Sequence, residues 1–156
     1  MKVKLIYIGK EDASDLQEAF TTYIAKIKYY LPFEVEVIPY LKNNKLTVDE
    51  QKKQEGKLLL KKLTNSDYVV LLDENGKEMT SVNFSQFLQQ QMLRGCKCLV
   101  FLIGGAYGFS EEVYTRGQYK IALSKMTFPH ILARLIFAEQ LYRVCTILKG
   151  EPYHHA

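Results

Sequence analysis

Three glycines follow a short apolar run near the middle of the chain, and this segment is the first place where the residue types suggest chemistry. The run Cys98–Ile103 has the composition of a buried strand, and Gly104-Gly105-Ala106-Tyr107-Gly108-Phe109-Ser110 comes next. Glycine lets the backbone approach a ligand closely. The segment lacks both the Lys-Ser/Thr ending of a P-loop and the spacing of a dinucleotide-binding loop. A backbone-lined ligand site and a tight strand-to-helix turn both stay open.

Two more loops follow apolar runs in the same way. Residues 73–76, which are typical of a turn, follow the run 68–72, and residues 124–129 follow the run 119–123. Ligands of open α/β sheets bind outside the carboxyl ends of the strands. We therefore expect the three loops to meet at one site.

The loop 124–129 leads into a long helical pattern. Thr127 is a candidate N-cap, with Pro129 at an early helical position. A simple helix entry with no other role accounts for the same composition.

The elements that must position these loops alternate along the chain. Apolar runs predict strands at 3–8, 33–38, 68–72, 98–103 and 119–123. Helical spacing predicts helices at 15–30, from about 47 to 63, and at 83–94, 111–115 and 130–148, and Thr47 with Glu50 forms a capping box. This alternation indicates an α/β fold with a mostly parallel sheet flanked by helices.

Size and composition fit one domain over residues 1–156. The chain is 47% hydrophobic and 24% charged, which is ordinary for a globular protein. No apolar run approaches the roughly 20 residues of a membrane helix, and the start of the chain has no signal-peptide pattern. We expect a cytoplasmic protein with no membrane contact.

The cysteines and the net charge narrow the partners only slightly. Cys96, Cys98 and Cys145 match neither a disulfide framework nor a zinc-binding spacing, so we expect reduced thiols and no metal. The formal net charge of +4 is compatible with nucleic-acid binding but does not require it.

Several segments together are similar to one known family. They are Leu123-Ser124-Lys125-Met126-Thr127-Phe128-Pro129-His130, Arg134, Glu139-Gln140-Leu141-Tyr142-Arg143, Pro152-Tyr153-His154-His155, Leu72-Asp73 with Gly76-Lys77, and Phe101-Leu102-Ile103-Gly104-Gly105 with Gly108. This pattern resembles the RlmH family of SPOUT-class methyltransferases, which methylate N3 of a pseudouridine in the helix 69 region of 23S ribosomal RNA.

The resemblance implies a fold feature, a cofactor and a partner. It implies a C-terminal trefoil knot over about residues 98–156, a homodimer formed through the helix 130–148, and 23S rRNA in the ribosome or large subunit as substrate. It also implies S-adenosylmethionine (SAM) as the methyl donor. The implied cofactor-binding residues are Leu72, Gly104, Leu123, Ser124, Lys125, Met126, Thr127 and Phe128.

The histidines are the candidates for handling the target's proton, because imidazole titrates near neutral pH. His130 lies beside the implied cofactor loop, and His154 and His155 lie on a tail able to fold over the site of either subunit. The alternatives are a locally bonded helix residue for His130 and an inert polar end for the tail.

Arg134 and Arg143 are candidates for RNA phosphate contacts, and Tyr153 for stacking on a base. Arg143 is equally placed to pair with Glu139, one helical turn earlier. Two other functions stay open: a non-catalytic RNA- or ribosome-binding protein that retains the fold, and a SPOUT methyltransferase with a different RNA target.

Overall fold

The computed structural model describes residues 1–9, 14–41 and 45–155, in which strands and helices alternate as predicted. In chain order the elements are β1 Lys2–Gly9, α1 Asp15–Tyr30, β2 Phe33–Pro39, α2 Val48–Lys61, β3 Tyr68–Glu78, α3 Ser81–Leu93, β4 Cys98–Ile103, α4 Glu111–Arg116, β5 Tyr119–Ala122 and α5 His130–Leu148.

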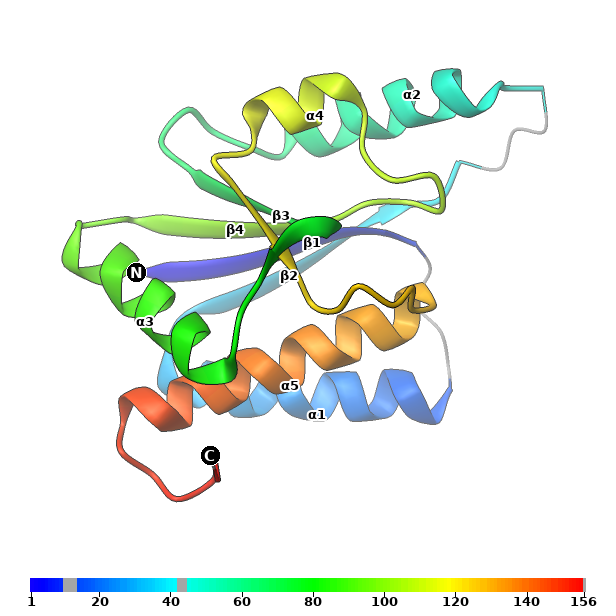
Figure 1. Ribbon diagram of the computed structural model, residues 1–156. Helices are drawn as coiled ribbons and strands as arrows, with labels where there is room; N and C mark the ends of the chain where they lie inside the picture. The colour runs from blue at the N-terminus through cyan, green and yellow to red at the C-terminus, as the bar shows by residue number, and fades with distance from the viewer. Residues whose placement is uncertain (10–13, 42–44, 156) are drawn as a thin grey trace.

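The five strands form one parallel sheet in the order β2-β1-β4-β3-β5. Figure 1 shows α2 and α4 over one face of this sheet and α1, α3 and α5 over the other. Each face carries its own hydrophobic cluster, and alternate residues of a strand serve the two clusters, as Leu5 and Ile6 of β1 do. Strands covered on both faces have to be apolar throughout, which is why β4 is nearly continuous in hydrophobic residues.

The third strand differs from its prediction. It does not end at residue 72 in a turn. Leu72 and Lys77 both pair with Ile121 of β5, so residues 73–76 leave the ladder as an excursion and the strand then resumes to Glu78. The polar, glycine-containing composition that predicted a turn produces this excursion inside the strand. The green excursion passes over the yellow β5 segment in Figure 1.

Side-chain caps set several helix starts. The capping box of Thr47 and Glu50 is confirmed, and α3 begins two residues before its predicted start because Thr80 accepts a hydrogen bond from the backbone N–H of Asn83. The N-cap prediction for Thr127 is wrong. Pro129 occupies the N-cap position of α5 without a side-chain bond, since Thr127 uses its hydroxyl elsewhere.

Strand order alone does not decide whether the chain end is threaded, and the trefoil knot stays a prediction. Within the described residues, no helix is both long enough and apolar enough to cross a membrane.

The excursion predicts a sharp difference between two glycines. A Cβ on Gly76 would lie 2.7 Å from backbone atoms of Lys120 and Ile121, whereas a Cβ on Gly9 would make ordinary contacts 3.6 Å from Tyr7. Backbone atoms of a paired strand cannot move aside. We expect Gly76→Ala to lower the free energy of unfolding by about 3 kcal/mol, and Gly9→Ala to change it by no more than about 0.5 kcal/mol. Urea unfolding of both variants measures the difference, and equal losses would contradict the close approach.

Candidate functional site

A pocket of about 400 Å³ lies at the carboxyl ends of β3, β4 and β5, where the three predicted loops meet. That volume is within the usual range for small-molecule sites. The residues lining it are Leu72, Asp73, Glu74, Asn75, Ile103, Gly104, Gly105, Ala106, Tyr107, Gly108, Phe109, Tyr114, Leu123, Ser124, Met126, Thr127, Phe128, His130 and Ala133.

The glycine loop brings bare backbone to the pocket wall. A Cβ on Gly104 would lie 3.2 Å from the Phe109 ring and 3.3 Å from the Gly108 backbone, so the loop folds tightly upon itself. Gly105 and Gly108 form an isolated antiparallel bridge, and Gly108 has a φ of +83°, a conformation that favours glycine. The two interpretations left open for this segment are therefore compatible: it is a tight turn, and it also lines the pocket.

Side-chain hydrogen bonds join the excursion of β3 to the loop before α5 and to α4. The Thr127 hydroxyl donates to Glu74 Oε2 at 3.0 Å, and the Tyr114 hydroxyl donates to Asp73. Asp73 also accepts from the backbone N–H of Asn75 at 2.9 Å. Burial and then the bond to Asp73 raise the pKa of Tyr114 to about 12, so this phenol stays a donor. The polar excursion of β3 is therefore a braced wall of the pocket.

The charge of the described pocket lining is negative. Asp73 and Glu74 contribute carboxylates, and no lysine or arginine belongs to the described lining. A phosphate-bearing nucleotide would face those carboxylates without a cationic side chain to offset them. The pocket therefore suits a ligand that carries positive charge and takes hydrogen bonds from backbone.

The structure gathers most of the residues that the family resemblance singled out. Leu72, Gly104, Leu123, Ser124, Met126, Thr127 and Phe128 line the pocket, whereas Lys125 is exposed and does not. Asp73, Glu74 and Tyr114 were not among the predicted cofactor residues. The first two carried a signal, since they begin a polar run directly after a buried strand; Tyr114 of α4 carried none.

The three histidines do not meet within one chain. His130 lines the pocket at the start of α5, but His154 contacts Arg143 near the far end of that helix. Arg143 lies 13 residues after His130 on the same helix, which is a distance of roughly 20 Å at the helical rise. His155 is exposed beyond His154. A single chain therefore brings only His130 to the pocket.

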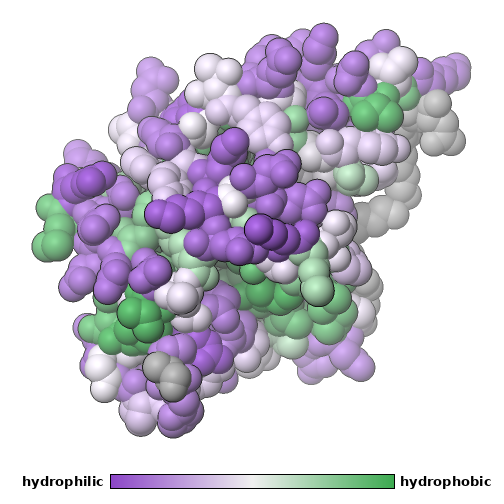
Figure 2. All heavy atoms as spheres, in the orientation of Figure 1, coloured by the Kyte–Doolittle hydropathy of each residue, from purple (hydrophilic) through white to green (hydrophobic). Residues whose placement is uncertain are grey.

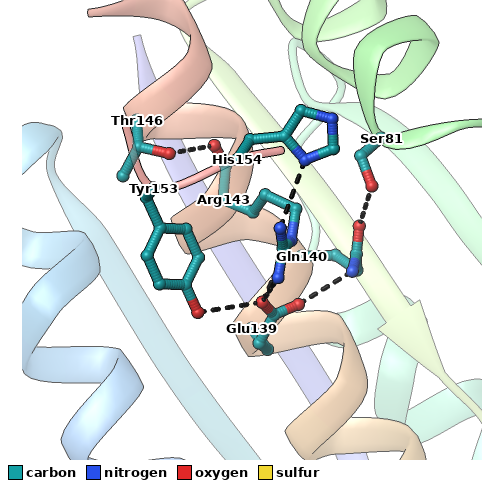
Figure 3. A network of polar contacts seen from close by, with 7 residues as sticks. All are labelled: Ser81, Glu139, Gln140, Arg143, Thr146, Tyr153 and His154. Carbon is teal, nitrogen blue, oxygen red and sulfur yellow. Dashed lines mark hydrogen bonds and ion pairs between the residues drawn. The ribbon is translucent and has the colours of Figure 1, made fainter. Parts of the chain in front are cut away.

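The tail is anchored to α5 by a polar network, which Figure 3 shows. Arg143 forms an ion pair with Glu139 at 2.6 Å, as its alternative interpretation expected, and donates to His154 Nδ1 at 3.2 Å. The Tyr153 hydroxyl donates to the same Glu139 oxygen at 3.1 Å. Gln140 donates to the other Glu139 oxygen at 2.8 Å and accepts from Ser81 of α3. Tyr153 and His154 are thus held in place and are not a free end.

Arg134 does not fit the predicted phosphate contact. Its side chain is buried, with the guanidinium carbon 4.3 Å from the centre of the Tyr7 ring and Nε donating to the carbonyl of His130. A guanidinium beneath the surface cannot meet an RNA backbone on this chain. Its position suggests instead that it holds the first turn of α5, where His130 lies.

Comparison with known proteins agrees with this architecture. A family model described as "Predicted SPOUT methyltransferase" matches residues 1–154, and the chain belongs to this family. Among curated proteins, it is 54% identical to one from Christiangramia forsetii and 55% identical to one from Parabacteroides distasonis, each over 156 residues and 99% of both chains. It is 52% identical to one from Cytophaga hutchinsonii over 155 residues, covering 99% of this chain and all of the other. All three relatives are named Ribosomal RNA large subunit methyltransferase H. The resemblance drawn from the motifs is confirmed.

The environment of His130 predicts its titration. Burial first, and then the charge of Arg134, lower the pKa of its imidazole below the ordinary 6.5. As the pH falls, His130 is therefore protonated in the unfolded chain before it is protonated in the folded protein. The neutral imidazole makes its full contribution to the free energy of unfolding above pH 6.5, and this contribution is lost as the pH falls toward the lowered pKa. NMR titration of the ring, assigned with His130→Gln, should give a pKa below 6.5. Arg134→Gln should restore only the smaller part of the shift, and a ring that titrates at or above 6.5 would contradict the burial.

Proposed function

We propose that this protein uses SAM to methylate N3 of a pseudouridine in the helix 69 region of 23S ribosomal RNA. The observation that carries the proposal is the pocket itself. In a chain of the SPOUT methyltransferase family, it joins three loops and is walled by glycine backbone, and its described lining holds two carboxylates but no lysine or arginine. SAM carries a sulfonium and an ammonium group against one carboxylate, so its net positive charge complements this lining. The curated relatives support ribosomal RNA as the substrate class.

The pocket offers what such a methyl donor needs. The backbone around Gly104, Leu123 and Ser124 can hold the adenine and ribose, and Leu72 and Phe128 add apolar contact. Asp73 and Glu74 face the positive end. The bound donor supplies a methyl group already activated by the sulfonium charge, so the protein's task is to orient the nucleophile and exclude water.

His130 is the best-placed residue to accept the proton that the target nitrogen must lose. It lines the pocket, and its lowered pKa keeps the imidazole neutral near pH 7, ready to take up a proton. Arg134 is a positioning residue in this scheme, because it bonds the His130 carbonyl and holds the first turn of α5.

A homodimer through α5 completes the proposed assembly. Ile131, Leu132, Ile136 and Ile147 are half-buried on this helix and belong to neither hydrophobic cluster. Figure 2 shows hydrophobic residues gathered over α5 and the segment leading into it, with a largely hydrophilic region above them. A second copy would cover this face and carry its anchored tail toward the first copy's pocket, where Tyr153, His154 and Arg143 can meet the RNA. The cytoplasm is the compartment in which this substrate is found.

Calorimetric titration with SAM tests the cofactor. The wild-type protein should bind SAM saturably. Gly104→Val should reduce the affinity by at least about tenfold, because the added side chain collides with Phe109 and the Gly108 backbone at the pocket wall. Ala25→Val adds similar bulk on the exposed face of α1 and is the control. A folded wild-type protein that binds no SAM, with or without ribosomes present, would support a non-catalytic RNA-binding role instead.

Removal of the tail separates cofactor binding from turnover. A chain ending at Pro152 lacks the Tyr153 and His154 contacts to α5 but leaves the pocket lining whole. We expect SAM affinity within about twofold of wild type and loss of methylation of large-subunit RNA, mapped by nuclease digestion and mass spectrometry. Unchanged turnover would exclude the tail from the RNA site, and a product at another nucleotide would identify a different RNA target.

A further inference from the structure

A buried acid lies directly behind the glycine loop. Glu55 of α2 is only 2% exposed, and a Cβ on Gly105 would lie 2.2 Å from its Oε2 and 2.8 Å from its Oε1. Its carboxyl group therefore packs against the Cα of Gly105. Gly105 lines the pocket but Glu55 does not, so the acid supports the wall from the side away from the ligand.

The next residue of α2 makes an equally close approach at the other end of the loop. A Cβ on Gly56 would lie 2.3 Å from the Ser110 hydroxyl and 3.2 Å from Val113. Ser110 closes the glycine loop and caps α4. Glu55 and Gly56 thus press α2 against the start and the end of this loop with no space between them.

The Glu55 carboxyl has few partners of its own. Among the described residues, Glu55 Oε2 and the Nε2 of Gln51, one turn earlier, are buried without a hydrogen-bond partner. Burial raises the pKa of Glu55, and the neighbouring Gln51 amide opposes this rise only in part. A buried acid with so little compensation costs stability. Its contact with Gly105 is a reason for a side chain of this length and shape to stand at this position.

We infer that Glu55 is a positioning residue for the glycine loop: its carboxyl fills the space behind Gly105 and fixes the Gly104–Gly105 backbone at the pocket wall. The role in methyl-donor binding rests on the function proposed above, whereas the contact with the loop does not. Glu55 acts through the loop and touches no reacting atom.

Amide hydrogen exchange of residues 104–109 tests the contact without any cofactor. Glu55→Asp shortens the side chain by one methylene and withdraws the carboxyl from Gly105, and Glu55→Gln keeps the length and shape. Leu59→Val trims a buried side chain one turn further along the same helix, in the hydrophobic cluster on the face of the sheet that α2 and α4 cover. We expect exchange in the loop to rise about tenfold in Glu55→Asp and to stay within about twofold of wild type in the other two variants.

A substitution on the opposite side of the contact tests the same geometry. Gly105→Ala forces a Cβ against the Glu55 carboxyl and should speed loop exchange on its own. Combining Gly105→Ala with Glu55→Asp should restore slower exchange, since the shorter acid makes room. Strict additivity of the two effects would overturn the inference, as would loop exchange in Glu55→Asp equal to that in Leu59→Val.

SAM titrations of the same proteins connect the contact to function. Affinity should fall about tenfold in Glu55→Asp and hold within about twofold in Glu55→Gln and Leu59→Val. A wild-type protein that binds no SAM would contradict the proposed function and leave the exchange result standing. Normal SAM affinity in Glu55→Asp, with wild type binding, would overturn the positioning role.

Discussion

The pocket depends on one constraint, which is how tightly the backbone is packed at the carboxyl ends of three strands. The excursion of β3 presses Gly76 onto the β5 backbone, and α2 presses Glu55 onto Gly105 behind the loop that follows β4. Neither contact leaves room for a Cβ. The main chain at the pocket is therefore packed tightly on both sides, and side-chain bonds such as Thr127 to Glu74 brace it further. Because this wall is already in place, the protein needs little reorganisation when a ligand binds, which lowers the entropic cost of binding.

Charge decides which ligand that wall accepts. Backbone amides at the ends of parallel strands often bind phosphates, but in such sites a cationic side chain usually also contacts the phosphate. Here Asp73 and Glu74 stand in the lining, and lysine and arginine are missing from its described residues. The nearby arginine, Arg134, is turned into the protein over Tyr7. Burial lowers the pKa of His130, and the charge of Arg134 lowers it further. The same arrangement thus opposes anions and keeps a neutral base.

Sequence patterns predicted the parts of the fold that local physics sets. Periodicity placed α1 and α5 with the bounds that the structure shows, and the Thr47 capping box is confirmed because its bonds are local. The excursion of β3 was taken for a turn, since only its pairing with β5 reveals that the strand resumes. Arg134 was a candidate for RNA phosphate contact, because its burial over Tyr7 depends on a strand distant in the chain. The implied cofactor residues came from family resemblance. Asp73 and Glu74 carried a signal as a polar run after a buried strand, whereas only the folded arrangement brings Tyr114 to the pocket.

The distance along α5 between His130 and the anchored tail bears on how the protein assembles. His130 lies at the pocket, and the network of Glu139, Arg143 and Tyr153 holds the tail near the other end of the helix, roughly 20 Å away at the helical rise. The network is braced to α3 through Gln140 and Ser81, so bringing the tail back along its own helix would break several bonds at once. A two-fold pair that buries the half-exposed isoleucines of α5 avoids that cost, because the anchored tail of one copy needs only to face the pocket of the other. In the proposed dimer, the anchored tail and the half-buried apolar face of α5 would serve one purpose, a reaction site shared between two chains.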